Sequence, residues 1–485
     1  MTPLSSVYRD PENGAFSDGA EWFRVASGES VTALRRFRGS PVYAGMVSRG
    51  EIVHFDELSS AEAEALVKIF SERSAREFPS DVVVFAVEKV NPVTYPWEWA
   101  NETLRSAALL TLSVRSQLLA LGLDLKDASA FNVQFRGSTP IFMDIGSIEL
   151  WKPNPTWKAL KQFIYHFLNP LAAGMSSEIS SAQAWRLGGG NNGVKSGESR
   201  RLMPLSQKFR PGLSLLQAAA VPAGTRSPGK RALQAESPSD RRLCLQANAS
   251  LINRLRRNVL LLKAKPHRST WASYGGRSHY SSEQLDKKKQ FSRSFVGDYA
   301  KAGDLVLDIG GNDGVVGLDL IENLDVRVIV ADSDSGALDM LSNVLVKTEE
   351  RSRLMPLVSD ITNLDSFRGL LGEEFEAFKN RVQPVAVLCH AVVHHLVISQ
   401  AIPMKLVAET LSVFNVPVQI EFVTEQDQKV RDLLAQINRW QGEYSLQALI
   451  SSLEQYFQVV EIAGFTTETR VVVEASVPLI PVRKT

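Results

Sequence analysis

Acidic and glycine residues follow a hydrophobic run in VLDIGGNDG, which spans residues 306–314. Asp308 comes two residues before Gly310 and Gly311, and Asn312 stands where the dinucleotide fingerprint GxGxxG has its second glycine. A carboxylate beside the loop would repel a pyrophosphate, whereas it can accept hydrogen bonds from an ammonium group. The motif therefore favours a ligand with a positive charge over a nicotinamide dinucleotide.

Two further acidic residues follow segments that we expect to be strands. Asp332 ends VRVIVAD, 18 residues after Gly314, where a carboxylate can accept hydrogen bonds from both hydroxyls of a ribose. Ser359 and Asp360 follow a third strand-like run and suit the exocyclic amine of a purine. An ammonium group, a ribose and an adenine in this order describe S-adenosylmethionine, which we therefore predict as the cofactor. The glycine loop that ends at Gly314 would be part of its site.

The chain from about residue 271 alternates between strand-like and helix-like segments, which predicts a parallel sheet with helices on both faces. We expect an α/β fold with a Rossmann-like, doubly wound sheet, whose last two strands, 459–465 and 469–475, form a hairpin at one edge. Ligands of such sheets bind beyond the carboxyl ends of the strands. Asp308 lies at one of these ends.

Three residues after the expected fourth and fifth strands are candidates for catalysis. His394 and His395, in CHAVVHHLVIS, could take a proton from an acceptor, or could be core residues. Neighbours on a helix point about 100° apart, so we expect at most one ring to face the pocket. Glu421, in PVQIEFV, is expected to end the fifth strand and could be a base, an acceptor anchor or a strand-end cap. We predict no metal site at Cys389, His390 and these histidines, because a strand-to-helix transition should scatter their side chains.

Composition limits the classes of protein. The chain has 44% hydrophobic and 22% charged residues, as is ordinary for a globular protein with a sizeable core. Lys plus Arg number 54 against 53 for Asp plus Glu, so the net charge offers no general attraction for nucleic acid or an anionic membrane. Two cysteines, an N-terminus without signal-peptide character and no apolar run near the ~20 residues of a membrane span lead us to expect a cytoplasmic protein without a membrane partner.

Changes in composition divide the chain into four parts. We expect an N-terminal domain at 1–182, a Gly-, Pro- and Ser-rich linker or insertion at 183–242, a helical connector at 243–270 and the α/β domain at 271–485. Part of the linker carries basic residues and no acidic one, so it is either a solvated connector or a contact for an anionic partner. The basic residues are Arg200, Arg201, Lys208, Arg210, Arg226, Lys230 and Arg231.

The N-terminal domain contains a second group of polar residues. KDASAFN separates Asp127 from Asn132 by four residues, and FMDIGS places Asp144 twelve residues later. This spacing resembles the catalytic and metal-binding loops of the protein-kinase-like fold. The sequence before them has no glycine-rich phosphate loop and no clear VAIK lysine. We therefore predict an α+β, degenerate kinase-like domain, with simple turn or capping roles for Asp127 and Asn132 as the alternative.

Several segments resemble a known family. WASYGGRSHYSSEQLDKKKQF, VLDIGGNDGVVG, HAVVHHLVIS, IPMKLVAETL and IEFVTEQD are similar to class I S-adenosylmethionine-dependent methyltransferases, and most closely to the group related to the rhizobial nodulation protein NoeA. The resemblance implies methyl transfer to a small-molecule or saccharide acceptor. An RNA or protein methyltransferase and a non-catalytic, cofactor-binding regulatory protein are the alternatives. Lys287, Lys288 and Lys289 of DKKKQF are expected to form a solvated face, or a segment that closes over the cofactor.

Overall fold

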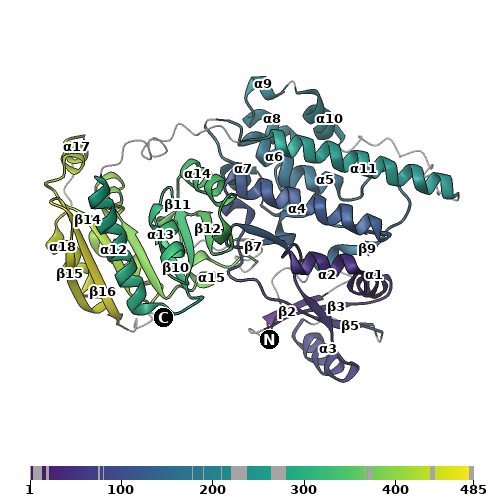
Figure 1. The fold of residues 1–485 in the computed structure, drawn as a ribbon, viewed down its shortest axis with the longest axis horizontal. Coiled ribbons are helices and arrows are strands. Elements are labelled where there is room, and N and C mark those ends of the chain that lie inside the picture. The colour runs from purple at the N-terminus through teal and green to yellow at the C-terminus, as the bar shows by residue number, and fades with distance from the viewer. Residues whose placement is uncertain are drawn as a thin grey trace. The chain divides into compact units, whose positions relative to one another are not determined.

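The computed structural model describes residues 2–3, 14–17, 21–74, 77–79, 81–176, 178–188, 190–208, 210–219, 237–263, 280–364, 368–369, 374–436 and 443–479. The chain divides into two compact units, and each has its own sheet (Figure 1). Unit 1 comprises Met1–Phe135, Thr139–Lys265 and Phe367–Glu376. Unit 2 comprises Arg136–Ser138, Pro266–Ser366 and Ala377–Thr485.

The described part of unit 1 includes an antiparallel sheet of five strands in the order β1-β2-β3-β5-β4. Helix α3 packs on this sheet, where the ring of its Phe70 stacks on Phe16 at 3.9 Å between centroids. These elements are β1 (Thr2–Pro3), β2 (Gly14–Ser17), β3 (Trp22–Ala26), α1 (Glu29–Arg38), α2 (Pro41–Ser48), β4 (Phe55–Glu57), α3 (Ser60–Ser74) and β5 (Val83–Val87).

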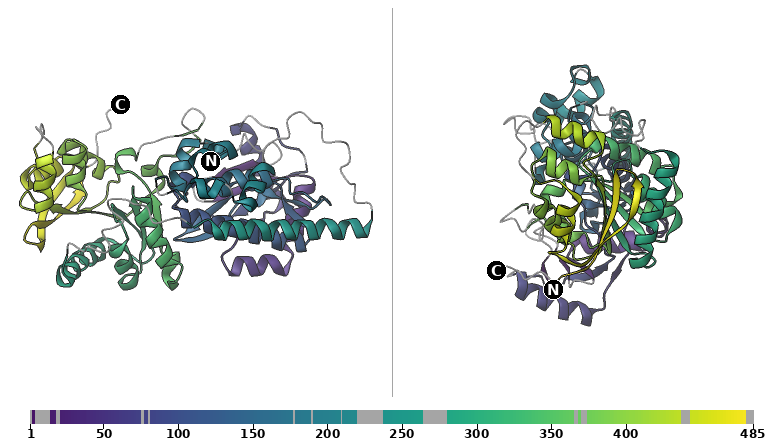
Figure 2. Two further views of the ribbon diagram at one scale, coloured as in Figure 1. Left: turned by 90° about the horizontal axis from the view of Figure 1, so that it is seen from above. Right: turned by 90° about the vertical axis from the view of Figure 1, so that its left-hand side faces the viewer.

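The second half of unit 1 is mainly helical. Its centre is α4 (Asn101–Ala120), which packs against α11 (Pro238–Leu261), the long helix in teal in Figure 2. Inside this contact the buried Arg115 guanidinium donates to Asp124 at 2.7 Å and to Asn248 at 2.5 Å. Two short strand pairs, β6 with β9 and β7 with β8, carry the loops of the kinase-like motif. The elements of this half up to residue 173 are β6 (Leu123–Leu125), β7 (Val133–Arg136), β8 (Thr139–Phe142), β9 (Ile148–Leu150), α5 (Leu160–Phe163), the π-helix η5 (Ile164–Leu168) and α6 (Asn169–Ala173).

Much of the segment expected to be a linker is helical and belongs to unit 1. Its helices are α7 (Ser181–Gly188), α8 (Ser196–Leu202), α9 (Leu205–Lys208) and α10 (Pro211–Ala219). Trp185, Val194 and Leu213 are buried in this segment. Packing of these apolar side chains stabilises the short helices, which the Gly- and Pro-rich composition did not predict. The remainder at 221–236, with Arg226, Lys230 and Arg231, lies outside the described residues.

The described residues of unit 2 form a sheet of seven strands in the order β12-β11-β10-β13-β14-β16-β15. Neighbours from β12 to β14 are parallel, and β15 and β16 form an antiparallel hairpin at one edge, as predicted. The sequence explains this arrangement, since β10, β12, β13 and β14 are short, mainly apolar strands that are buried along their whole length. The strands are β10 (Leu305–Ile309), β11 (Arg327–Asp332), β12 (Leu354–Val358), β13 (Ala386–His390), β14 (Val418–Val423), β15 (Phe457–Thr467) and β16 (Arg470–Pro478).

The order of these strands locates the site. The chain runs outward from β10 to β12 and then returns to β13 on the other side of β10, so the strand order reverses between β10 and β13. A crevice opens at such a point beyond the carboxyl ends of the strands. The helices of unit 2 are α12 (Ser282–Tyr299), α13 (Val315–Asn323), α14 (Ser335–Leu345), α15 (Phe378–Arg381), α16 (Met404–Ser412), α17 (Gln428–Gln436) and α18 (Leu446–Leu453). None of the helices in the described ranges is long and apolar enough to cross a membrane.

Candidate functional site

A cavity of about 560 Å³ opens at the carboxyl ends of β10, β11, β12 and β13 in unit 2. Most of the residues singled out from the sequence line it: Asp308, Gly310, Gly311, Asn312, Asp332, Ser359, Asp360, His394 and His395. Gly314 and Glu421 are not among the lining residues. The strand ends thus bring together side chains that lie up to 87 residues apart in the sequence (308 to 395).

The glycine loop between β10 and α13 bends sharply at Gly310 and Gly314. Gly310 has a φ of 71°, and a Cβ there would lie 2.2 Å from Val392 Cγ2. Gly314 caps the N-terminus of α13 with a left-handed φ of 72°, and a Cβ there would meet Leu341 at 2.6 Å. Larger residues would clash at both positions, so glycine keeps the loop close to its neighbours and leaves its backbone open toward the cavity. Gly314 therefore shapes the loop without lining the cavity.

Asp308 is a buried carboxylate at the end of β10, with only 2% of its surface exposed. Burial raises its pKa to about 7, and the charges of Asp332 and Asp313 act in the same direction, while nearby Lys288 opposes them. A group with this pKa exchanges its proton near neutral pH. A ligand cation beside Asp308 would favour the ionised form.

Asp332 and Asp360 are held in place by backbone amides. The two carboxylate oxygens of Asp332 accept hydrogen bonds from the Asn312 amide at 2.9 Å and the Asp334 amide at 2.8 Å. Asp360 caps a short 3₁₀ helix by accepting from the amide and the hydroxyl of Thr362, at 2.9 and 2.7 Å. These bonds fix the direction in which each carboxylate faces, while further lone pairs on the oxygens stay available to a ligand.

His394 and His395 both contribute to the lining of the cavity, and the expectation that at most one of the two rings faces it stays a prediction. Their ring centroids lie 3.9 Å apart at the start of the π-helix η11 (His395–Ser399). Burial lowers the pKa of His394 to about 2, helped by His395, Arg470 and Lys429, and burial with Lys429 lowers the pKa of His395 to about 4. Both rings are therefore uncharged near neutral pH.

His390, the last residue of β13, is a third histidine in the lining. Its Nε2 lies 3.1 Å from Gln419 Oε1, while Gln419 Nε2 donates to the Phe291 carbonyl and to Glu474. With the Gln419 amide fixed in this way, His390 Nε2 is the donor and its Nδ1 carries a lone pair. Within the described residues this buried Nδ1, like that of His394, has no hydrogen-bond partner.

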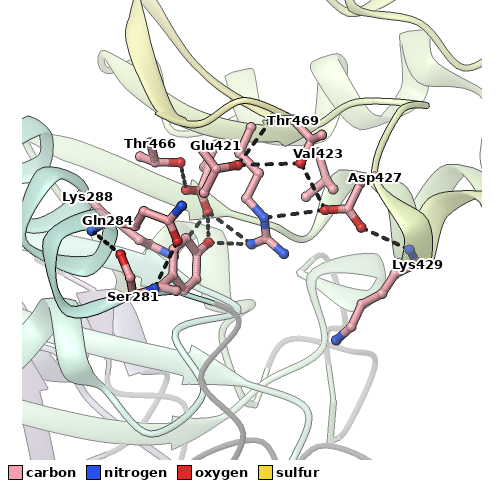
Figure 3. Close-up of polar contacts among 12 residues, drawn as sticks. Ser281, Gln284, Lys288, Glu421, Val423, Asp427, Lys429, Thr466 and Thr469 are labelled. Carbon is pink, nitrogen blue, oxygen red and sulfur yellow. Dashed lines mark hydrogen bonds and ion pairs between the residues drawn. The ribbon is translucent and has the colours of Figure 1, made fainter.

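Glu421 is the centre of a buried ionic network at the end of β14 (Figure 3). Its carboxylate accepts from the Tyr280 hydroxyl at 2.5 Å, the Thr466 hydroxyl at 2.5 Å and the Lys288 ammonium at 3.2 Å. Burial alone would raise its pKa, but Lys288, His390 and Arg470 overcome that effect and lower it to about 2. The carboxylate is ionised and fully engaged, which favours an anchoring role over that of a base.

Three residues that line the cavity, Tyr280, Lys429 and Arg470, were not singled out from the sequence. Lys288, which also lines the cavity, was expected either on a solvated face or in a segment that closes over the cofactor, and only 12% of its side chain is exposed. Its spacing from Ser292, Phe295 and Val296, the buried residues of α12, places it on the inner face of that helix. Helical periodicity could therefore have identified Lys288. Arg470 is the first residue of the buried strand β16. A charged residue at the start of a buried strand could likewise have indicated a site residue.

In unit 1 the structure brings the kinase-like residues together. Asp127 accepts from the Ser129 amide at 2.7 Å and from Asn132 Nδ2 at 3.2 Å. Burial raises the pKa of Asp127, and the charge of Asp144 raises it further. Asp144 forms an ion pair with Arg24 of β3 and accepts from the Gly146 amide at 3.2 Å. Among the described residues no group of three or more His, Cys, Asp or Glu side chains is arranged to hold a metal ion.

Comparison with solved structures finds partial likenesses. They include an inferred O-methyltransferase of Nostoc punctiforme, the magnesium protoporphyrin IX methyltransferase ChlM of Synechocystis PCC 6803 with bound S-adenosylmethionine, and the bifunctional kinase-methyltransferase WbdD. Their sequences are 15%, 13% and 17% identical and their TM-scores are 0.30, 0.28 and 0.29. Each likeness covers 40% of this chain, and 57%, 79% and 39% of the respective solved chain. At these TM-scores they carry no argument.

Comparison by sequence gives a likeness over most of the chain. No protein-family model matches it. The chain is 29% identical over 460 residues to the nodulation protein NoeA of Rhizobium meliloti (strain 1021), and the alignment covers 94% of this chain and 92% of NoeA. The chain is therefore a homologue of NoeA along nearly its whole length, which confirms the resemblance predicted from its sequence.

Proposed function

We propose that unit 2 is an S-adenosylmethionine-dependent methyltransferase that acts on a small-molecule or saccharide acceptor. The observation that carries this proposal is the cavity at the reversal of strand order, where Asp308, Asp332 and Asp360 surround a loop of open backbone. Along the chain the three carboxylates come in the order Asp308, Asp332 and Asp360. This order matches a ligand that presents an ammonium group, a ribose and an adenine amine in the same order.

Each carboxylate has a distinct role in this proposal. Asp308 accepts from the ammonium group, because its buried charge needs a cation as partner. Asp332 accepts from the ribose hydroxyls, and Asp360, with Ser359, accepts from the adenine amine. Leu364 and Phe378 also line the cavity and offer apolar surface to the purine ring.

The protein's main chemical task is to align the acceptor with the methyl group. The bound sulfonium supplies an electrophilic methyl carbon, and such alignment can lower a barrier by ~7 to 11 kcal/mol. A general base adds ~100- to 10,000-fold when its pKa lies near the working pH. His394, His395 and His390 have pKa values of about 2, about 4 and about 4, each lowered first by burial. The three histidines are weak bases, so alignment of the acceptor contributes more to the rate than base catalysis does. Glu421 serves to anchor Tyr280 and Lys288.

For unit 1 we propose a kinase-like fold that does not transfer phosphate. The antiparallel sheet of β1 to β5, the long helix α4 and the paired strands β6 to β9 support this relation, together with the placement of Asp127 and Asn132 in one loop and Asp144 in another. In an active kinase the carboxylate equivalent to Asp144 holds magnesium. Here Arg24 neutralises it, which leaves recognition of a partner or acceptor as the role of this unit.

Calorimetry on the full-length protein tests the cofactor proposal. We expect S-adenosylmethionine and S-adenosylhomocysteine to bind, and NAD not to bind. Incubation with S-adenosylmethionine labelled in its methyl group, followed by mass spectrometry of small-molecule extracts, RNA and protein, then identifies the class of acceptor. Tight NAD binding without S-adenosylmethionine binding would refute the proposal, and label found only in RNA or protein would favour the alternative acceptors. Binding without any labelled product would favour a regulatory protein.

A further inference from the structure

We infer that helix α11 (Pro238–Leu261) of unit 1 binds the surface of an anionic lipid bilayer. The charge, exposure and spacing of the residues on this one helix support the inference. In this arrangement α11 lies along the bilayer surface and does not cross it. The cavity of unit 2 takes no part, so the inference goes beyond the proposed methyltransferase function and does not depend on it.

One side of α11 packs on unit 1 and the other side is exposed. Figure 2 shows this long teal helix at the edge of the unit. Cys244, Ile252, Leu255 and Val259 are buried on the packed side. Because successive residues of a helix point about 100° apart, the residues opposite them share one arc of about 160°, which we call the basic face. Its residues, all exposed, are Arg242, Leu243, Gln246, Ala249, Ser250, Asn253, Arg254, Arg256, Arg257, Leu260 and Leu261.

The positive charges of the basic face are not balanced by acidic residues. Residues 241–263 include six basic residues and no acidic one. Among the described residues, no hydrogen bond or ion pair is formed by the guanidinium groups of Arg242, Arg254, Arg256 and Arg257. Like charges on one face repel each other, and a surface of negative charge offsets this repulsion. The basic face therefore suits an anionic partner.

Three leucines on the basic face distinguish a lipid surface from other anionic partners. Leu243, Leu260 and Leu261 are 62%, 45% and 48% exposed, although leucine is among the residues most often buried. At a bilayer the lipid phosphates pair with the guanidinium groups, and the leucines enter the boundary of the acyl chains. A nucleic acid would pair with the arginines and leave the leucines in water. The mixture of arginine and leucine therefore favours a bilayer.

The position of the leucines sets the direction of the helix. Leu243 and Leu260 lie 17 residues apart (243 to 260), which is about 26 Å along a helix. Contact at both positions needs a helix axis parallel to the bilayer. The arginines at 254, 256 and 257 then lie between the two contacts, at the level of the lipid phosphates.

The net charge of the chain hides this local concentration of positive charge. The chain balances 54 basic residues with 53 acidic ones, and this balance led us to expect no membrane partner. Salt screens charges that lie further away than about 8 Å, so a surface responds mainly to the charges nearest to it. Six positive charges within residues 241–263 therefore attract an anionic bilayer although the chain as a whole is nearly neutral.

Flotation of the full-length protein with lipid vesicles tests this inference. The anionic probe is a vesicle of phosphatidylcholine and phosphatidylglycerol in a ratio of about 7 to 3, and the neutral probe is a vesicle of phosphatidylcholine alone. We expect the protein to float with the anionic vesicles and not with the neutral ones. Binding should weaken as the salt concentration rises, because ions screen the attraction.

Two sets of substitutions separate the contribution of charge from that of apolar contact. The combined variant Arg254→Gln, Arg256→Gln and Arg257→Gln should lower the partition coefficient about a hundredfold, since each basic residue near an anionic surface contributes about fivefold. Leu260→Ser with Leu261→Ser keeps every charge and should lower the partition coefficient at least about tenfold. All five side chains are exposed, so the variants should fold normally, which circular dichroism checks.

The control removes the same number of charges elsewhere. Arg36→Gln, Lys68→Gln and Lys405→Gln combined neutralise three exposed residues on α1, α3 and α16. This variant should bind anionic vesicles nearly as well as the wild type does. A loss equal to that of the arginine variant of α11 would overturn the inference, because net charge alone would then explain binding.

Three other results would also overturn it. The first is no flotation with anionic vesicles at low salt. The second is equal flotation with neutral vesicles, since the charges of the basic face would then have no part in binding. The third is a single-stranded RNA that binds more tightly than the anionic vesicles and just as tightly to the leucine variant, which would identify a nucleic acid as the partner. Binding of S-adenosylmethionine should be unchanged in every variant, so a failure here leaves the proposed function intact.

Discussion

Asp308→Asn should make the protein more stable and at the same time remove most of its cofactor affinity. Burial moves the pKa of Asp308 from its ordinary value of 3.8 to about 7. At about 1.4 kcal/mol for each pKa unit, the buried charge then costs up to about 4 kcal/mol of stability above neutral pH. Asn has nearly the same shape and no charge, so the variant avoids this cost.

The sign of the pH dependence follows from the raised pKa. The folded protein binds the Asp308 proton more tightly than the unfolded chain does, so stability falls as the pH rises from 3.8 to about 7. Below this window wild type and Asp308→Asn should be equally stable, and above it the variant should be more stable. Urea denaturation of both proteins at about pH 4, pH 6 and pH 8 measures the difference. Asp286→Asn is the matched control, because Asp286 is an exposed aspartate of unit 2 that does not line the cavity.

Cofactor binding should change in the opposite direction. Loss of a hydrogen bond to a charged group removes about 1.5 to 3 kcal/mol, which is about a 10- to 150-fold weaker Kd for S-adenosylmethionine. In the wild type the affinity should fall about tenfold for each pH unit below 7, because the ligand needs the ionised carboxylate. The variant should lose the part of this dependence that Asp308 causes. A variant that is less stable than wild type at pH 8, or that binds the cofactor as tightly, would refute the reasoning.

Three other predictions follow from the site. His394→Gln and His395→Gln should each lower kcat by about a hundredfold or less without changing cofactor affinity, since weak bases give at most the low end of base catalysis; steady-state kinetics on the acceptor checks this, and a loss of several thousandfold would contradict it. Glu421→Gln should lower the free energy of unfolding by about 3 to 5 kcal/mol, because it breaks a buried ion pair, with the exposed Glu409→Gln as control in the same urea titration. Incubation with labelled ATP and magnesium should give no phosphate transfer, and transfer that Asp144→Ala abolishes would show an active kinase.

The sequence predicted the sheet of unit 2 well because each strand carries a local signal. Short runs of Val, Ile and Leu ended at acidic or glycine residues, and β11 begins one residue inside the expected run VRVIVAD and ends with it at Asp332. The same signals placed Asp308, Asp332 and Asp360 at one edge of the sheet, because parallel strands share their carboxyl ends. The π-helix His395–Ser399 after β13 has no comparable signal, so the backbone that carries the two histidines could not be predicted.

The basic part of the cavity depends on contacts between residues far apart in the sequence. Lys288 and Arg470 meet at Glu421 across 133 and 49 residues, and no local pattern relates the three positions. A single charged residue on a helix or at a strand end is usually a solvated side chain, and it becomes part of a site only when the fold buries it beside an opposite charge. The network around Glu421 aligns Tyr280, Lys288 and Arg470 with the cavity before any ligand arrives. A site whose charged side chains are fixed in advance binds its ligands without reorganising, and this is the condition that methyl transfer by alignment requires.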